Sequence, residues 1–145
     1  GERIKMELFR SFHISGSALT AEKLRIDVVA SNLANMQTTR TAAGGPYRRR
    51  TVVFGERLTQ AQRPQQFRGE GVRVAAIVED PSPPRLEHDP EHPDADEEGF
   101  VAYPNIDLAK EMTDLITASR SYEASTTAIN TAKSLYLKAL EIGRG

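Results

Sequence analysis

Residues 105–145 read NIDLAKEMTDLITASRSYEASTTAINTAKSLYLKALEIGRG, and this stretch decides the fold. Apolar or small side chains recur in it every three or four positions, which is the spacing of a helix that packs along a partner helix. Asn105 or Asp107 can cap its start, no Gly or Pro interrupts residues 106–142, and Gly143 can end it. A helix of this length is about 50 Å long, longer than a small globular domain is wide. The predicted seam is Leu108, Met112, Leu115, Ser119, Tyr122, Thr126, Ile129, Lys133, Tyr136 and Leu140.

This seam is thin. Ser119, Thr126 and Lys133 occupy three of its ten positions, whereas Leu135 and Leu137 lie to either side of it on a helical projection. A narrow charged strip opposite the seam consists of Arg120, Glu123, Lys138 and Glu141. Apolar surface therefore extends past one stripe, and we expect the helix to contact more than one neighbour within an assembly. The alternative is an ordinary amphipathic helix that covers the core of a single domain.

Composition limits the possible functions. The chain has 145 residues, a formal net charge of −1 and no cysteine. This length suits one domain, or one small domain with extensions, and the near-neutral charge argues against general nucleic-acid binding. The lack of cysteine excludes disulfides, thiolate metal sites and thiol catalysis. No apolar run approaches the roughly 20 residues of a membrane span, and the first residues do not lead into a signal core, so we expect a soluble chain without a cleaved signal peptide.

The N-terminal residues 4–35 contain the candidate partner of the long helix. Apolar side chains keep a helical spacing at Leu8, Phe12, Leu19, Ile26, Val29 and Leu33. Gly16 and Ser17 interrupt this pattern, because Gly costs about 1 kcal/mol in a helix interior and Ser prefers helix ends. The stronger helix is therefore predicted from about Ser17 to Asn32, with a kink or a separate segment before it.

The middle of the chain predicts strands and loops. Residues 51–54 and 72–78 are rich in β-branched side chains, and residues 99–103 offer one further short strand. Residues 55–71 are polar and are predicted to form a long loop, while five prolines break up residues 81–93.

The sequence therefore predicts an α+β fold. Long N- and C-terminal helices pair as a coiled-coil-like unit, and a small β-rich insert lies between them in the sequence. We expect three parts: residues 1–45 with the N-terminal helix and its exit loop, residues 46–103 with the β-rich unit and its loops, and residues 104–145 with the long C-terminal helix.

Residues 30–35, ASNLAN, followed by Thr38 and Thr39, carry a family resemblance. They resemble the A-x-N-L-A-N-x-x-T-T signature of bacterial flagellar basal-body rod and hook proteins, and among these the chain is most similar to proximal rod proteins. Five further segments carry it in order: ISGSALT (14–20), GPYRRRTVVF (45–54), VEDPSPP (78–84), HPDADEEGFVAYPN (92–105) and EMTDLITASRSYEA (111–124). The resemblance covers nearly the whole chain.

The resemblance implies a structural, non-catalytic subunit of the rod that crosses the periplasm and serves motility. Such a subunit is delivered by the flagellar type III export apparatus and polymerises with copies of itself and other rod proteins around a central channel. Both terminal helices would pair into an inner tube, with the β-rich insert outside it. The residues expected to carry assembly are Asn32, Leu33, Asn35, Thr38, Leu108, Met112, Leu115, Arg120, Tyr122, Ile129, Tyr136 and Leu140.

Asn32 and Asn35 stand at the end of the first predicted helix. Their short amides can satisfy the orphan carbonyls of a helix end and hold the exit loop. A local role of this kind needs no contribution to assembly, and this alternative stays open.

Motifs that would carry catalysis or cofactor binding are weak in this sequence. Asp94, Asp96 and Glu98 match the first positions of a calcium loop, but Asn105 stands where the loop needs a bidentate Glu. His88 and His92 are separated by prolines and lack an indicated third metal ligand. We therefore expect no cofactor, no metal, no small-molecule substrate and no enzymatic activity, and we interpret residues 94–99 as a solvated acidic turn.

The β-rich insert is divided into a basic and an acidic half. Residues 40–73 hold eight arginines against two glutamates, and residues 79–98 hold nine acidic residues against one arginine. The acidic half would repel a nucleic acid bound at the arginines, so we expect no nucleic-acid partner. Either the halves pair within one chain, or the basic edge of one subunit meets the acidic edge of the next. We favour the second, with Arg48, Arg49, Arg50, Asp94, Asp96 and Glu98 as subunit contacts. A competing hypothesis is a coiled-coil adaptor that forms a closed oligomer.

Overall fold

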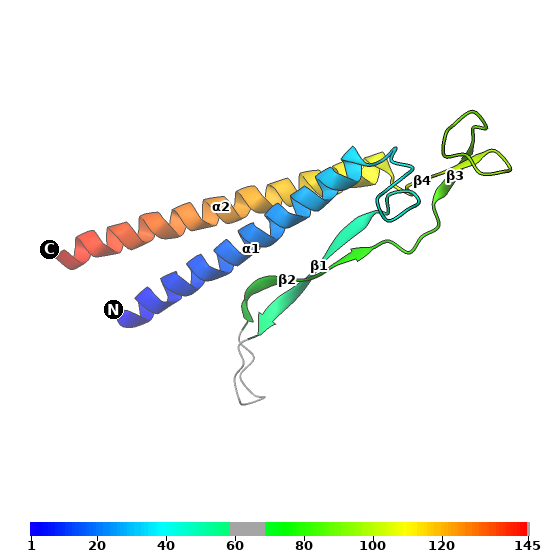
Figure 1. Ribbon diagram of the computed structural model, residues 1–145. Coiled ribbons are helices and arrows are strands. Elements are labelled where there is room, and N and C mark those ends of the chain that lie inside the picture. Colours follow the sequence, from blue (N-terminus) through cyan, green and yellow to red (C-terminus); the bar gives the residue numbers. More distant parts are fainter. Residues whose placement is uncertain (59–68, 145) are drawn as a thin grey trace.

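The computed structural model describes residues 1–58 and 69–144, with side chains described for residues 1–55 and 76–144. Helix α1 spans Glu2–Ala34 and helix α2 spans Leu108–Arg144, and the two pack side by side in antiparallel directions, so that both chain ends lie at one tip (Figure 1). Between them the chain forms four strands: one antiparallel pair runs back beside α1, and the other lies beyond the end of the helix pair opposite the chain termini. The predicted α+β fold with paired terminal helices is confirmed, whereas the division into three units at residues 45 and 103 stays a prediction.

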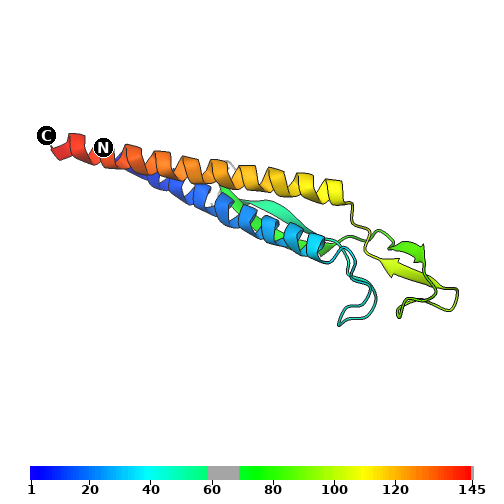
Figure 2. The ribbon, with the colours of Figure 1, turned by 90° about the horizontal axis from the view of Figure 1, so that it is seen from above.

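The strands form two antiparallel pairs. Strand β1 (Arg50–Leu58) pairs with β2 (Gly69–Glu79) through a register that shifts after Val53 and after Glu56. This hairpin packs against α1, and Figure 2 shows it running beside the helix pair. Strand β3 (Arg85–His88) pairs with β4 (Phe100–Tyr103) and projects beyond the helices. Neither described helix contains a segment apolar enough to cross a bilayer.

Two strand predictions are confirmed and extended, and one strand was missed. The strands predicted at residues 51–54 and 72–78 lie within β1 and β2, and β4 occupies most of the segment predicted at residues 99–103. Part of the loop predicted at residues 55–71 is strand instead, and residues 59–68 lie outside the described part of the chain. Strand β3 was not predicted, because the prolines before and after it hide four residues whose pairing depends on β4.

Helix α1 is continuous, and the predicted interruption near Gly16 is wrong. Ser17 donates its hydroxyl hydrogen to the Ile14 carbonyl at 2.8 Å, and Thr20 donates to the Gly16 carbonyl at 3.1 Å. These bonds to the preceding turn let polar side chains sit inside a helix without unfolding it. Gly16 therefore lowers the helix propensity of this segment, but α1 continues through it.

The contact face of α2 differs from the predicted seam at every second position. Ala118 and Ala132 are buried, and Leu115, Tyr122, Ile129 and Tyr136 are half-buried. The seam thus follows positions 111, 115, 118, 122, 125, 129, 132 and 136. Ala118, Ser125 and Ala132 take the places in it that were predicted for the residues that follow them, Ser119, Thr126 and Lys133. Small side chains let the two helix backbones approach closely, and a search for large apolar residues overlooks them.

We expect Gly16→Ala to stabilise the free subunit by about 1 kcal/mol, because Ala is the better helix former and a methyl group there meets no atom within 4 Å apart from the local backbone of its own helix. Urea unfolding followed by circular dichroism measures this change. Gly44→Ala is the matched control, since Gly44 has a φ of +85° and a side chain there should cost about 1 kcal/mol. A loss of stability in Gly16→Ala would contradict a continuous α1.

Candidate functional site: the polar junction

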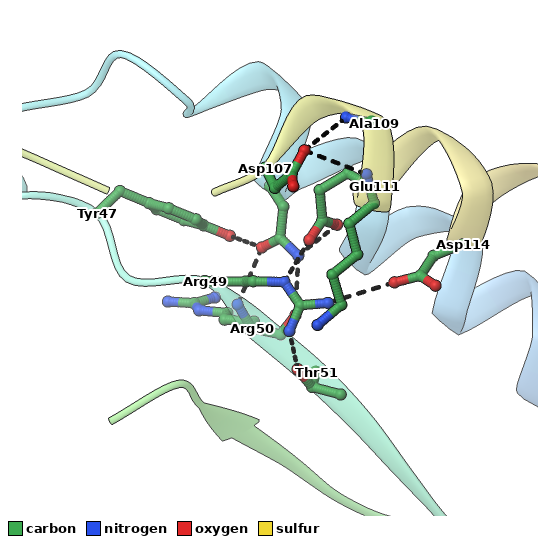
Figure 3. Close-up of polar contacts among 10 residues, drawn as sticks. Tyr47, Arg49, Arg50, Thr51, Asp107, Ala109, Glu111 and Asp114 are labelled. Carbon is green, nitrogen blue, oxygen red and sulfur yellow. Dashed lines mark hydrogen bonds and ion pairs between the residues drawn. The ribbon is translucent and has the colours of Figure 1, made fainter. Parts of the chain in front are cut away.

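Three chain segments meet where α1 ends and where β1 and α2 begin, and polar side chains fill their meeting point (Figure 3). We call this cluster the polar junction; it consists of Asn32 from α1, Tyr47 and Arg49 from the segment before β1, and Glu111 and Asp114 from α2. Asn32 and Glu111 are both 0% exposed. They are the only buried polar or charged residues in the described part of the chain, and the junction joins α1, α2 and the segment before β1.

Asn32 is the amide at the centre of the junction. Its Nδ2 donates to the Arg50 carbonyl at 2.8 Å and to Glu111 Oε2 at 3.2 Å. Its Oδ1 accepts from the Tyr47 hydroxyl at 2.9 Å and from the Arg50 backbone N–H at 3.0 Å. A primary amide offers two donors and two lone pairs, so every hydrogen-bonding position of Asn32 is used. Through its two bonds to the Arg50 backbone, the Asn32 side chain pairs with the first residue of β1 as a neighbouring strand would.

Glu111 and Arg49 form a buried ion pair next to this amide. Arg49 Nε contacts Glu111 Oε1, while its Nη2 lies 3.3 Å from Asp114 Oδ2 and its Nη1 donates to Thr51 Oγ1 at 3.0 Å. The Arg49 side chain is 13% exposed and that of Glu111 is fully buried. A charge buried without a partner would cost several kcal/mol, so the pair fixes Arg49 and Glu111 to each other.

The first turn of α2 directs Glu111 into the junction. Asp107 Oδ1 accepts from the Ala109 N–H at 2.9 Å, and the Asp107 carbonyl accepts from the Glu111 N–H at 3.0 Å. Asp107 is therefore the cap of α2, in preference to Asn105, the alternative that the sequence left open. An acidic side chain in the first turn is also favoured by the positive end of the helix dipole.

The remaining motif residues shape the exit from α1. Asn35 Nδ2 donates to the Ser31 carbonyl at 2.8 Å, and Asn35 Oδ1 accepts from the Thr38 hydroxyl at 3.0 Å. The Thr38 carbonyl in turn accepts from the Tyr47 N–H at 3.1 Å. Asn35 thus satisfies a carbonyl of the helix end, as predicted for both asparagines, whereas Asn32 binds β1 and α2 instead.

A second tie connects the exit loop of α1 with the loop between β3 and β4. Asp94 accepts from the Thr39 hydroxyl at 2.7 Å and pairs with Arg40 at 2.7 Å. The Thr39 hydrogen bond lowers the pKa of Asp94 below its usual value, and the Arg40 charge adds to this effect. Because the folded-state pKa is lowered, this tie is present at neutral pH and is lost as the pH falls through that value.

The other acidic residues of this loop stabilise a turn. Asp96 Oδ1 accepts from the backbone N–H groups of Glu98 and Phe100, both at 2.9 Å, and Gly99 supplies a φ of +84°. Among residues 1–58 and 69–144, no three His, Cys, Asp or Glu side chains are grouped so that they could hold a metal ion.

The structure separates the six predicted subunit contacts into two groups. Arg49 is paired inside its own chain and is not available to a neighbour, which corrects the proposed role of this residue; Asp94 is tied to the exit loop. Arg48, Arg50, Asp96 and Glu98 are exposed, and the Arg50 guanidinium lies 5.7 Å from the centre of the Tyr47 ring. Internal pairing therefore uses part of the basic half, and the exposed residues keep their proposed role.

Sequence reasoning missed Tyr47, Glu111 and Asp114. One signal for Glu111 was present, since it stands four residues before Leu115 and seven before Ala118, in phase with the buried face of α2. Asn32 likewise follows Val28 and Val29 on the buried face of α1. A polar side chain in phase with a buried stripe indicates a buried hydrogen-bonding partner.

We expect Arg49→Ala and Glu111→Ala each to lower the free energy of unfolding by about 3–5 kcal/mol, because each leaves the other charge buried and unpaired. The double variant should cost less than the sum, with a coupling of about 2 kcal/mol. Urea unfolding of the four proteins measures this cycle, and Glu123→Ala, on the exposed face of α2, is the control with little effect. Additive costs would mean that the pair contributes no specific interaction.

Two family models match the chain at its helices. The model described as flagella basal body rod protein matches residues 12–40, and the model described as flagellar basal body rod FlgEFG protein C-terminal matches residues 97–142. The two buried polar residues of the junction lie in different matches: Asn32 in the first and Glu111 in the second.

Whole-length relatives extend the similarity across the β-rich unit. The chain is 45% identical to a flagellar basal-body rod protein FlgC of Borreliella burgdorferi, over 97% of this chain and all of the relative. It is 47% identical to a FlgC of Bacillus subtilis and 42% identical to one of Escherichia coli O157:H7, in each case over 96% of this chain and all of the relative. The chain therefore belongs to the FlgC family of flagellar basal-body rod proteins.

Proposed function

We propose that this chain is a structural subunit of the proximal rod of the bacterial flagellar basal body, where it polymerises with copies of itself and with other rod proteins into a drive shaft around an export channel. The observation that carries this proposal is the identity of 45–47% to FlgC proteins from two bacteria over nearly the full chain. The role proposed is mechanical rather than catalytic.

The surface of the free subunit supports a role in an assembly. The chain exposes 10630 Å². A compact monomer of 16.0 kDa would expose about 7,400 Å². Large apolar side chains contribute to this excess along both helices, for example Ile4, Phe9, Ile116 and Leu137. Exposed apolar side chains in this number are typical of proteins that bury them against partners.

The packing of the helices and the hairpin supports a position for each of them in the rod. Helix α2 packs on α1, and the β1–β2 hairpin packs on α1, so most of the perimeter of α2 is left for neighbouring subunits. We place the helix pair in an inner tube and the strands outside it. The subunit would reach the periplasm through the flagellar type III export apparatus.

A closed coiled-coil oligomer is the alternative, because it too would cover the exposed stripes of both helices. Sedimentation of the purified protein separates the two. A closed oligomer reaches a fixed mass at high concentration, whereas a rod subunit stays monomeric or forms open-ended aggregates. The identity to rod proteins favours the second outcome.

Ile129→Asp and Leu33→Asp should abolish swimming in cells that depend on this protein. Both side chains are half-buried on the helix pair, and a carboxylate there must be desolvated when the helices assemble. Swimming in soft agar, together with immunoblots of protein level, measures the effect. Glu123→Ala, on an exposed face, should swim normally. Intact swimming of both Asp variants at normal protein level would show that the seam between the two helices is not needed for assembly.

Arg48→Glu combined with Arg50→Glu should block incorporation into the rod while the free subunit keeps its β content. Both side chains are exposed, and the bonds of Arg50 within the polar junction come from its backbone. Immunoblots of isolated basal bodies measure incorporation, and circular dichroism measures β content. Adding Asp96→Lys and Glu98→Lys should partly restore incorporation by exchanging the two charges across the interface. Loss of β signal in the arginine variant would indicate pairing within one chain instead.

A further inference from the structure

Residues 85–103 hold β3, β4 and the loop between them, and they extend past the end of the helix pair (Figure 1). We call them the arm. Within the described part of the chain, β3 and β4 contact each other and no other helix or strand. An isolated two-stranded hairpin is at best marginally stable in water, so the arm depends on contacts with the rest of the chain. Its orientation must come from its base and from contacts of its loop.

The base of the arm consists of two proline-containing connectors, residues 80–84 and 104–107. The first is anchored by the Asp80 N–H, which donates to the Arg49 carbonyl at 2.8 Å, and the second by Pro104, which is fully buried. A cavity of about 50 Å³ lies between the connectors and the segment before β1. Atoms that face a void lose packing contacts, so this base fixes the position of the arm more firmly than its direction.

Asp94, in the loop of the arm, binds the exit loop of α1. Its Oδ2 accepts from the Thr39 hydroxyl at 2.7 Å, and its Oδ1 lies 2.7 Å from Arg40 Nη2. Figure 2 shows the exit loop and the arm beyond the same end of the helix pair. Among the residues whose side chains are described, 1–55 and 76–144, these are the only hydrogen bond and the only ion pair between the arm and the rest of the chain.

Bonds within the arm hold Asp94 in place for this contact. The Asp94 N–H donates to His92 Nδ1 at 3.0 Å, and the His92 ring packs edge-on against the Tyr103 ring at the base, with the ring centres 6.3 Å apart. Asp96 Oδ1 accepts from two backbone N–H groups of the following turn, both at 2.9 Å. The arm is therefore a small ordered unit that carries one carboxylate toward the exit loop.

We propose that the arm is hinged at its base and that Asp94 latches it to the exit loop through Thr39 and Arg40. A hydroxyl on one carboxylate oxygen and a guanidinium on the other fix the direction of the arm as well as its position, as bidentate pairs do. The latch joins two of the segments that carry the family resemblance, residues 30–39 and 92–105. It acts within the free subunit, so the inference does not depend on the proposed function.

The absence of cysteine in the native sequence allows two spin labels to be attached at chosen positions. Glu97→Cys marks the arm and Glu123→Cys marks α2, and both positions are exposed. Pulsed electron paramagnetic resonance of the purified full chain then measures the distribution of distances between the two labels. With the latch intact, this doubly labelled chain should give one narrow distribution.

Two variants remove the latch from opposite sides. Thr39→Val combined with Arg40→Gln removes both donors from the exit loop, and Asp94→Ala removes the carboxylate from the arm. Each should replace the narrow distribution by a broad one, because the arm then turns about its base. Glu91→Gln is the matched control: it neutralises an exposed acid of the same loop and should leave the narrow distribution unchanged.

A narrow, unshifted distribution in both latch variants would overturn the proposal, because the buried base, with Val101 and Pro104, would then set the direction alone. A broad distribution in the chain with its latch intact would overturn it too. Amide chemical shifts of β3 and β4, measured by NMR, report whether the arm stays folded. If Asp94→Ala unfolds the arm, the exit-loop variant decides the outcome, because it changes no bond within the arm.

Discussion

The ion pair between Arg49 and Glu111 is the constraint on which the rest of the structure depends. A carboxylate with no exposed surface is tolerated because a guanidinium and the Asn32 amide share its charge and its lone pairs. These groups belong to the start of one helix, the end of the other and the segment that begins a strand. Satisfying one carboxylate therefore sets the orientation of the helices and of the β1–β2 hairpin together, which apolar packing alone would leave adjustable.

The helix pair itself is stabilised more loosely than the junction. Its seam consists of small residues and half-buried larger ones, and its most buried side chains include Ala118 and Ala132. Such a seam fixes a close approach of the backbones but removes little apolar area from water, so it provides modest stability. The large apolar side chains lie mostly elsewhere on the two helices. The polar junction therefore fixes the shape of the chain near it, whereas the rest of the helix pair depends on neighbouring subunits for its stability.

Much of the fold could be predicted from periodicity and breakers alone. Long uninterrupted spacing gave α2, the β-branched runs gave parts of β1 and β2, and ASNLAN with its threonines marked the end of α1. The seam register of α2 was missed because alanines carry little hydrophobic signal, and β3 was missed because its only partner is a strand twelve residues further on. Arg49 and Glu111 could not be paired from sequence, since 62 positions separate them and both look like surface residues. Their burial is a property of the meeting of three segments, not of any one of them.

The antiparallel course of α1 and α2 has a practical consequence for work with this protein. Because the first and last residues of the two helices lie at the same tip, an affinity tag or fluorescent protein fused to either terminus arrives beside an apolar groove there, which Ile4, Leu8 and Leu140 help to line. Neither fusion is therefore a neutral label, and moving it from one terminus to the other does not change the surface that it crowds. A label attached to a side chain on the exposed polar middle of α2, such as Asn130, stays away from that tip.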